Sequence, residues 1–180
     1  YNQHEEHEVT QAKCMSLMHY YFKVDHKKCD EFFIKCALSE HGLEHNIGSR
    51  LLSFNIEIAF ANTCPDLIFI SRQLKPELTN LYGNDDDLHR LIQMSLELAL
   101  NHENISAAHK LEFITLVLKT SLENTKKEDH AKTLRLAIEH ALDHGKEDLL
   151  IALLGNRSLC KDRITLFDLL RITLRGIITS

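Results

Sequence analysis

The scarcity of glycine and proline constrains this chain more than any other feature of its sequence. Only six glycines and two prolines occur in 180 residues. An all-β chain of this length needs many tight turns, and those turns depend on glycine and proline at defined positions. Apolar residues, 44% of the chain, recur instead at intervals of three and four. The sequence therefore predicts an all-α fold of about seven to nine amphipathic helices.

Capping residues place the helices of the second half. The acidic run at residues 85–87 begins one helix, Ser106 caps the next, and a third begins near Asp129. Gly145 ends that third helix in the left-handed conformation typical of a helix C-terminus. A short apolar helix and a last helix from about residue 162 follow.

The two prolines divide the first half. Residues 8–41 are predicted to form one long helix or two shorter ones, and residues 49–61 form the next. Pro65 suits the first turn of a further helix, which Pro76 ends near Leu74.

One short phrase recurs in the second half. Residues 99–102 read Ala-Leu-Asn-His, and residues 141–144 read Ala-Leu-Asp-His, 42 residues later. Two helices per roughly 40–47 residues is the period of HEAT and armadillo-like arrays. The alternatives are a short α-solenoid of such helix pairs and an irregular helical bundle. We expect one domain over residues 1–180, or a subdivision into 1–83 and 84–180, in a chain whose non-Met start indicates missing upstream residues.

Cysteine usage and hydropathy bear on the compartment. Five cysteines without a C-x-x-C pair do not form the pattern of a secreted disulfide scaffold, so reduced thiols are expected. No run of about 18 apolar residues and no basic-then-apolar leader occurs, so neither a membrane span nor a signal peptide is expected. The predicted location is the cytoplasm, or a host cytosol if the chain is a secreted effector.

Twelve histidines make a metal site worth testing. The best candidate is a helical stripe of residues spaced alternately by three and four: His19, Phe22, His26, Cys29, Phe33 and Cys36. Only neighbouring members can share one ion, because seven residues of helix rise about 10 Å. His26 and Cys29 are the best pair, with further ligands from Cys14, Cys64 or Cys160. The alternative is a packing seam that tolerates two histidines, and no cofactor is expected on that interpretation.

Catalytic motifs are absent from the sequence. His140 and His144 have the spacing of a zinc peptidase pair, but Ala141 stands where the general base is required. His144 is predicted instead to interact with carbonyl groups at a helix C-terminus. No P-loop, G-x-S-x-G or His-Asp dyad occurs, and Cys64 beside Pro65 has no basic neighbour to stabilise a thiolate. These observations favour a non-catalytic protein.

Charge indicates the class of partner. A net charge of -5 argues against a nucleic-acid-binding protein. The C-terminal segment is locally basic, and Arg163, Arg171 and Arg175 are its candidate binding residues. This patch suits an acidic protein, a phosphate group or a phosphoinositide. The alternative is a solvated charged face without a binding role.

The sequence favours a non-catalytic protein-protein interaction or regulatory module, such as an adaptor, scaffold or effector. One alternative is a metal-binding helical protein with a catalytic or sensory role that uses His26 and Cys29. Another is a homodimeric regulator, because the leucine-rich segments 149–154 and 166–174 supply apolar surface for a homo-oligomer.

Overall fold

The described part of the chain is helical. The computed structural model describes residues 3–37, 39, 47–74, 85–159, 171, 174, 175 and 178, with side chains at most of these positions. Within these residues it contains eight α-helices and one 3-10 helix, and no strand. The predicted all-α fold is confirmed. None of these helices has the length and apolar character needed to cross a membrane.

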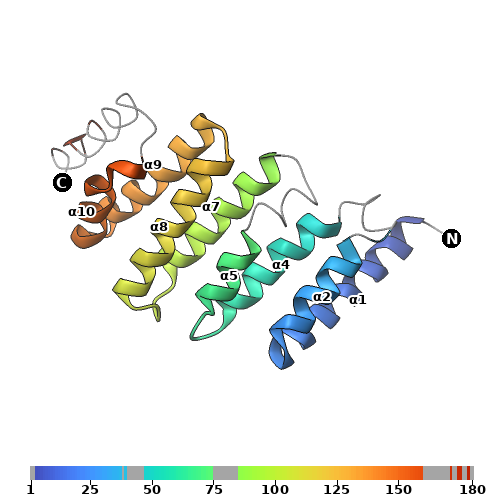
Figure 1. Ribbon diagram of the computed structural model, residues 1–180. Helices are drawn as coiled ribbons and strands as arrows, with labels where there is room; N and C mark the ends of the chain where they lie inside the picture. Colours follow the sequence, from blue (N-terminus) through green and yellow to red (C-terminus); the bar gives the residue numbers. More distant parts are fainter. Residues whose placement is uncertain are drawn as a thin grey trace. The chain divides into compact units, whose positions relative to one another are not determined.

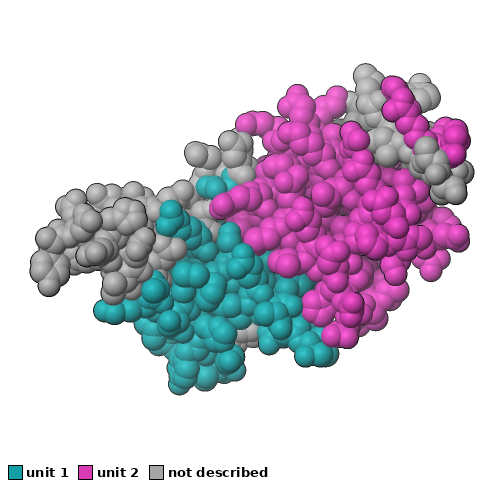
Figure 2. All heavy atoms as spheres, turned by 180° about the vertical axis from the view of Figure 1, so that it is seen from behind, with its two compact units in different colours: residues 1–87 teal, residues 88–180 magenta. Residues whose placement is uncertain are grey.

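The chain forms two compact units, residues 1–87 and 88–180 (Figure 2). The helices of unit 1 are α1 (Gln3–Val24), α2 (His26–Ala37), α4 (Ile47–Ala61) and α5 (Leu67–Gln73). Unit 2 contains most of α7 (Asp85–Asn101), followed by α8 (Ala107–Asn124), α9 (Lys127–Asp143), α10 (Glu147–Gly155) and the 3-10 helix η1 (Arg157–Leu159) (Figure 1).

A single residue turns the chain between α1 and α2. The Asp25 carboxylate accepts hydrogen bonds from the backbone N–H groups of Lys27 (3.0 Å) and Lys28 (3.4 Å), which caps the start of α2. The two helices then run antiparallel, since Tyr21 contacts Phe32 with ring centroids 5.5 Å apart, close to the turn. The cap shows why the first half contains two helices here and not one.

Large apolar side chains from all four helices build the core of unit 1. Helix α2 packs on α1 and α4, and α4 packs on α5. The largest fully buried side chains of the unit are Met18, Phe33, Leu51, Leu52, Ile56, Phe69, Ile70 and Leu74. Phe69 is set in place by the N-cap of α5, because the Asp66 carboxylate accepts a hydrogen bond from its backbone N–H at 2.9 Å. The sequence had indicated that Pro65 lies in the first turn of this helix. Pro65 instead precedes the N-cap, because the Asp66 side chain caps the first turn.

The core of unit 2 is built from residues at helical spacing on α7, α8 and α9. Leu91 and Leu96 on α7, Ile114 on α8 and Ile138 on α9 are 1% exposed or less. Helix α9 packs on both α8 and α10, and α10 also contacts α8. Their spacing agrees with the apolar periodicity of the sequence, because a buried face on a helix recurs every three to four residues.

The ends of the unit 2 helices are capped by recognisable motifs. Ser106 accepts a hydrogen bond from the His109 backbone N–H at 3.3 Å and caps α8, as predicted. Gly145 has φ of 60° after α9, and Lys146 N–H donates to Ala141 O at 2.8 Å, which is the Schellman arrangement. The sequence placed the start of α9 near Asp129. The helix begins two residues earlier, at Lys127, and Asp129 lies in its first turn.

Candidate functional site

A pocket of about 770 Å³ opens where four helix ends meet in unit 2. The end of α7 and its connection to α8 form one side, with the first turns of α8. The end of α9 and the start of α10 form the other. Leu100, Ile105, Leu111 and Leu149 supply apolar wall, and lysine, histidine and carboxylate side chains surround it. Pockets of roughly 300–1,000 Å³ are typical of natural ligand sites.

Lys110 is the central cation of the pocket. Its Nζ donates hydrogen bonds to Leu100 O (3.0 Å) and His102 O (2.8 Å), so this α8 side chain caps the C-terminal carbonyl groups of α7. Burial lowers the pKa of Lys110, and the positive charge of Lys146 lowers it further. The ammonium group is thus held by neutral carbonyl oxygens beside a second cation.

Two histidines at the end of α9 line the same pocket. The rings of His140 and His144 stack with centroids 4.1 Å apart. His144 Nδ1 donates to His140 O at 3.0 Å, because a carbonyl oxygen can only accept. This is the helix-terminal interaction predicted for His144. Burial lowers the pKa of His140, and the charges of His144 and Lys110 add to that effect.

Burial is the main cause of both pKa shifts in the pocket. Both Lys110 and His140 hold protons less readily than usual, and neighbouring positive charge contributes to each shift. The first turn of α10 also lies at the pocket, and a helix N-terminus carries partial positive charge. Glu147 and Asp148 are exposed at this turn. The pocket lining thus combines two lysines and three histidines with the carboxylates of Glu103, Glu147 and Asp148.

The positive charge of Lys146 also lowers the pKa of His140, so its removal should raise that pKa. In Lys146→Gln we expect its ring to titrate closer to the ordinary value of 6.5 than in the unmodified chain. Histidine ring resonances followed by NMR against pH measure this change. Lys119→Gln, an exposed change of the same kind on α8 away from the pocket, should leave the His140 titration unchanged. Equal titration of His140 in all three proteins would contradict the described electrostatics.

The lowered pKa of His140 also has a consequence for stability. The unfolded chain takes up a proton on this ring near pH 6.5, whereas the folded chain does so only at lower pH. The unfolding free energy should therefore fall as the pH drops below about 6.5 and level off below the folded-state pKa. His140→Gln should reduce this fall, which denaturant titrations at several pH values would measure.

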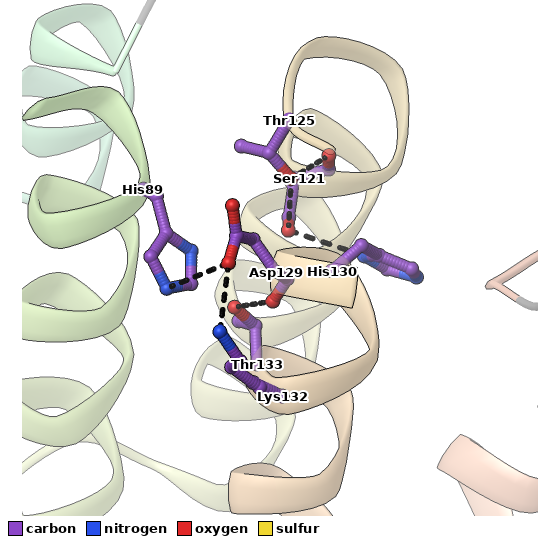
Figure 3. A network of polar contacts seen from close by, with 7 residues as sticks. All are labelled: His89, Ser121, Thr125, Asp129, His130, Lys132 and Thr133. Atoms are coloured by element: carbon purple, nitrogen blue, oxygen red, sulfur yellow. Dashed lines mark hydrogen bonds and ion pairs between the residues drawn. The ribbon is translucent and has the colours of Figure 1, made fainter. Parts of the chain in front are cut away.

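A buried polar network joins α8, α9 and η1, and Figure 3 shows its contacts between α8 and α9. His130 Nε2 is 2.7 Å from Leu159 O, and His130 Nδ1 is 3.1 Å from Ser121 Oγ. The carbonyl oxygen can only accept, so Nε2 carries the proton and Nδ1 accepts from the Ser121 hydroxyl. Ser121 is 0% exposed and His130 is 2% exposed. Substrate cannot reach this Ser-His pair, so its role is structural.

A second set of polar contacts in the same view links α7 to α9 (Figure 3). His89 Nε2 lies 3.9 Å from Asp129 Oδ1, and Lys132 Nζ donates to the same oxygen at 3.1 Å. The hydrogen bond from Lys132 holds the pKa of Asp129 below its usual range, and His89 contributes in the same direction. His89 Nδ1 is buried without a hydrogen-bond partner among the described residues.

The structure separates the predicted histidine-cysteine stripe into two helices. His19 lies on α1, whereas Cys29 and Cys36 lie on α2, because α1 ends at Val24. Cys29 is fully buried, and its Sγ is 3.7 Å from both Met18 O and Asn55 Oδ1. The side chain of His26 lies outside the described ones. Among the described residues, no three His, Cys, Asp or Glu side chains form a group that could hold a metal ion.

The remaining predicted site residues lie elsewhere. Arg171 and Arg175 are exposed, whereas Arg163 lies outside the described residues, so the basic patch stays a prediction. Cys64 is exposed in the connection before α5, two residues ahead of the cap at Asp66. A thiol in that position is not part of the helix N-terminus.

The pocket itself was not predicted, although the sequence contained a signal for it. The recurring phrase at residues 99–102 and 141–144 falls at the ends of α7 and α9. Both copies contribute to the pocket, the first through Leu100 and His102 and the second through His144. The two phrases thus lie at helix ends that line the same pocket. In comparisons with known proteins, no family model, no curated protein and no solved structure matches this chain.

Proposed function

We propose that this chain is a non-catalytic protein-interaction module that holds an acidic segment of a partner protein in the unit 2 pocket. The observation that carries the proposal is the position of two lysines, Lys110 and Lys146, at an open pocket with an apolar wall. Lys110 and His140 both have lowered pKa values, and neighbouring cations contribute to each. A partner carboxylate would relieve this repulsion, which is the condition for an attractive charged contact.

The apolar wall gives the partner segment a second point of attachment. Leu111 and Leu149 are partly exposed in the pocket, so an aliphatic or aromatic partner side chain would be removed from water there. An apolar side chain next to an acidic one is therefore the expected recognition pattern. The net charge of -5 repels acidic partners at long range, so recognition depends on close contact with this pocket.

The described lining of this pocket lacks a hydroxyl or thiol nucleophile. The pocket contains histidines and carboxylates, but none of its lining residues is a serine, cysteine or threonine that could act as a nucleophile. The Ser121-His130 pair, which has suitable atoms, is buried away from solvent. Binding is the activity that these residues support.

The test begins with a random peptide library displayed on phage and selected on the full-length chain. We expect enriched peptides to combine an acidic residue with a large apolar one. Their affinity, measured by fluorescence anisotropy, should fall about tenfold or more in Lys146→Glu, because the change replaces attraction with repulsion. Lys146 is exposed and its side chain makes no cap hydrogen bond to α10, so this change should not disturb folding.

Lys119→Glu is the matched control. It changes the net charge equally and lies in the same unit, but outside the pocket. Peptide affinity should be nearly unchanged in this variant and should fall when the acidic residue of the peptide is replaced by its amide. Equal losses in Lys119→Glu and Lys146→Glu, or enrichment of basic peptides, would refute the proposal.

A further inference from the structure

Two cysteines from different helices face each other in unit 1. Cys36 on α2 donates its thiol hydrogen to Cys14 on α1, with the two Sγ atoms 3.6 Å apart. Both side chains are half-buried. The antiparallel hairpin sets this contact, because Asp25 turns the chain about midway between the two cysteines.

The separation of the sulfur atoms is close to what a covalent bond requires. An S–S bond is about 2.05 Å long, so the sulfurs must approach by roughly 1.5 Å. Rotation about the Cα–Cβ bonds changes the separation of the sulfurs, and it can bring them into bonding range when the Cβ atoms lie about 3.5–4.5 Å apart. The hairpin therefore holds two reduced thiols ready for intramolecular bonding.

We propose that Cys14 and Cys36 form a reversible modification site, at which a hydroperoxide oxidises the two thiols to a disulfide. Cys14 Sγ first attacks a peroxide oxygen: the O–O bond breaks, a sulfenic acid forms and water or an alcohol leaves. Cys36 Sγ then attacks Cys14 Sγ, so the S–S bond forms and the S–O bond breaks. The departing hydroxide takes the Cys36 proton and leaves as water. Two electrons pass from the sulfurs to the peroxide, and a thiol reductant returns them.

The order of the two cysteines follows from their environments. Burial raises the pKa of Cys36 to about 12, and the hydrogen bond to Cys14 adds to the shift. Cys36 therefore keeps its proton at neutral pH, which makes it a poor first nucleophile and leaves Cys14, the acceptor of its thiol hydrogen bond, to attack the peroxide. Cys29 does not compete, since it is fully buried and its thiol lies against Met18 O and Asn55 Oδ1.

The experiment treats the full, reduced chain with one equivalent of hydrogen peroxide and then blocks remaining thiols with N-ethylmaleimide. Trypsin can cleave between the two cysteines at Lys23 and Lys27. Mass spectrometry should find the Cys14 and Cys36 peptides joined, with the loss of two hydrogen atoms, and dithiothreitol should separate them. In Cys36→Ser, dimedone should trap a sulfenic acid at Cys14.

Cys64→Ser is the control, because Cys64 is an exposed thiol outside the hairpin. This variant should form the joined peptides as fully as the unmodified chain. The result for the unmodified chain is sufficient to overturn the proposal, so the test does not depend on whether a variant folds. If peroxide oxidises Cys64 while Cys14 and Cys36 remain open to N-ethylmaleimide, the pair is not a modification site.

Discussion

Replacement of His130 by alanine should lower the unfolding free energy by about 2–4 kcal/mol. The imidazole is 2% exposed and hydrogen-bonds Ser121 Oγ and Leu159 O, so it ties α8 and η1 to α9. Alanine leaves both groups without this partner in the interior and opens a cavity between the helices. Chemical denaturation followed by circular dichroism measures the loss.

Two control variants separate the effect of the His130 hydrogen bonds from the general effect of replacing a histidine by alanine. Ser121→Ala removes one of the two bonds and should cost about 1 kcal/mol. His109→Ala makes the same substitution at an exposed position of α8 and should change stability by less than about 0.5 kcal/mol. Hydrogen exchange should also rise around η1 in His130→Ala alone. Equal effects of the two histidine substitutions would show that His130 does not connect these elements.

Local patterns explain which parts of the fold could be predicted. The buried positions on α7 and α8, such as Leu96 and Ile114, recur at the intervals of three and four on which the all-α prediction depends. Capping at Ser106 and the end of α9 at Gly145 are equally local signals. The turn at Asp25 was left open between one helix and two, because the apolar stripe continues across it and only the carboxylate cap interrupts the helix.

The candidate site depends on contacts between different helices, which the spacing of residues along the sequence does not predict. Lys110 on α8 caps α7, and His130 reaches Leu159, 29 residues later. Such pairs are determined by how the helices pack, so the sequence alone assigned neither residue a role. His26 and Cys29 do lie on one helix, α2, but the side chain of His26 lies outside the described ones, so this pair stays a prediction.

Substitution of Asn55 should produce the other large effect, this time in unit 1. Asn55 on α4 is 0% exposed, and its Nδ2 donates to Gln73 Oε1 on α5 at 3.3 Å. Its Oδ1 lies 3.7 Å from Cys29 Sγ on α2, which makes Asn55 the polar link between three helices. Asn55→Leu should cost about 2–4 kcal/mol, because Gln73 loses this hydrogen bond inside the core and the larger side chain must be packed.

Asn62 supplies the comparison, since it is an exposed amide after α4 that donates to Ile58 O at 3.3 Å. Asn62→Leu should cost less than about 1 kcal/mol, because water can replace the lost contact. The decisive measurement is a double-mutant cycle by chemical denaturation. Asn55→Leu combined with Gln73→Leu should cost at least about 1 kcal/mol less than the sum of the single changes, since neither partner is then left polar. Strict additivity would mean that the two buried amides do not depend on each other, and packing alone would then account for the loss in Asn55→Leu.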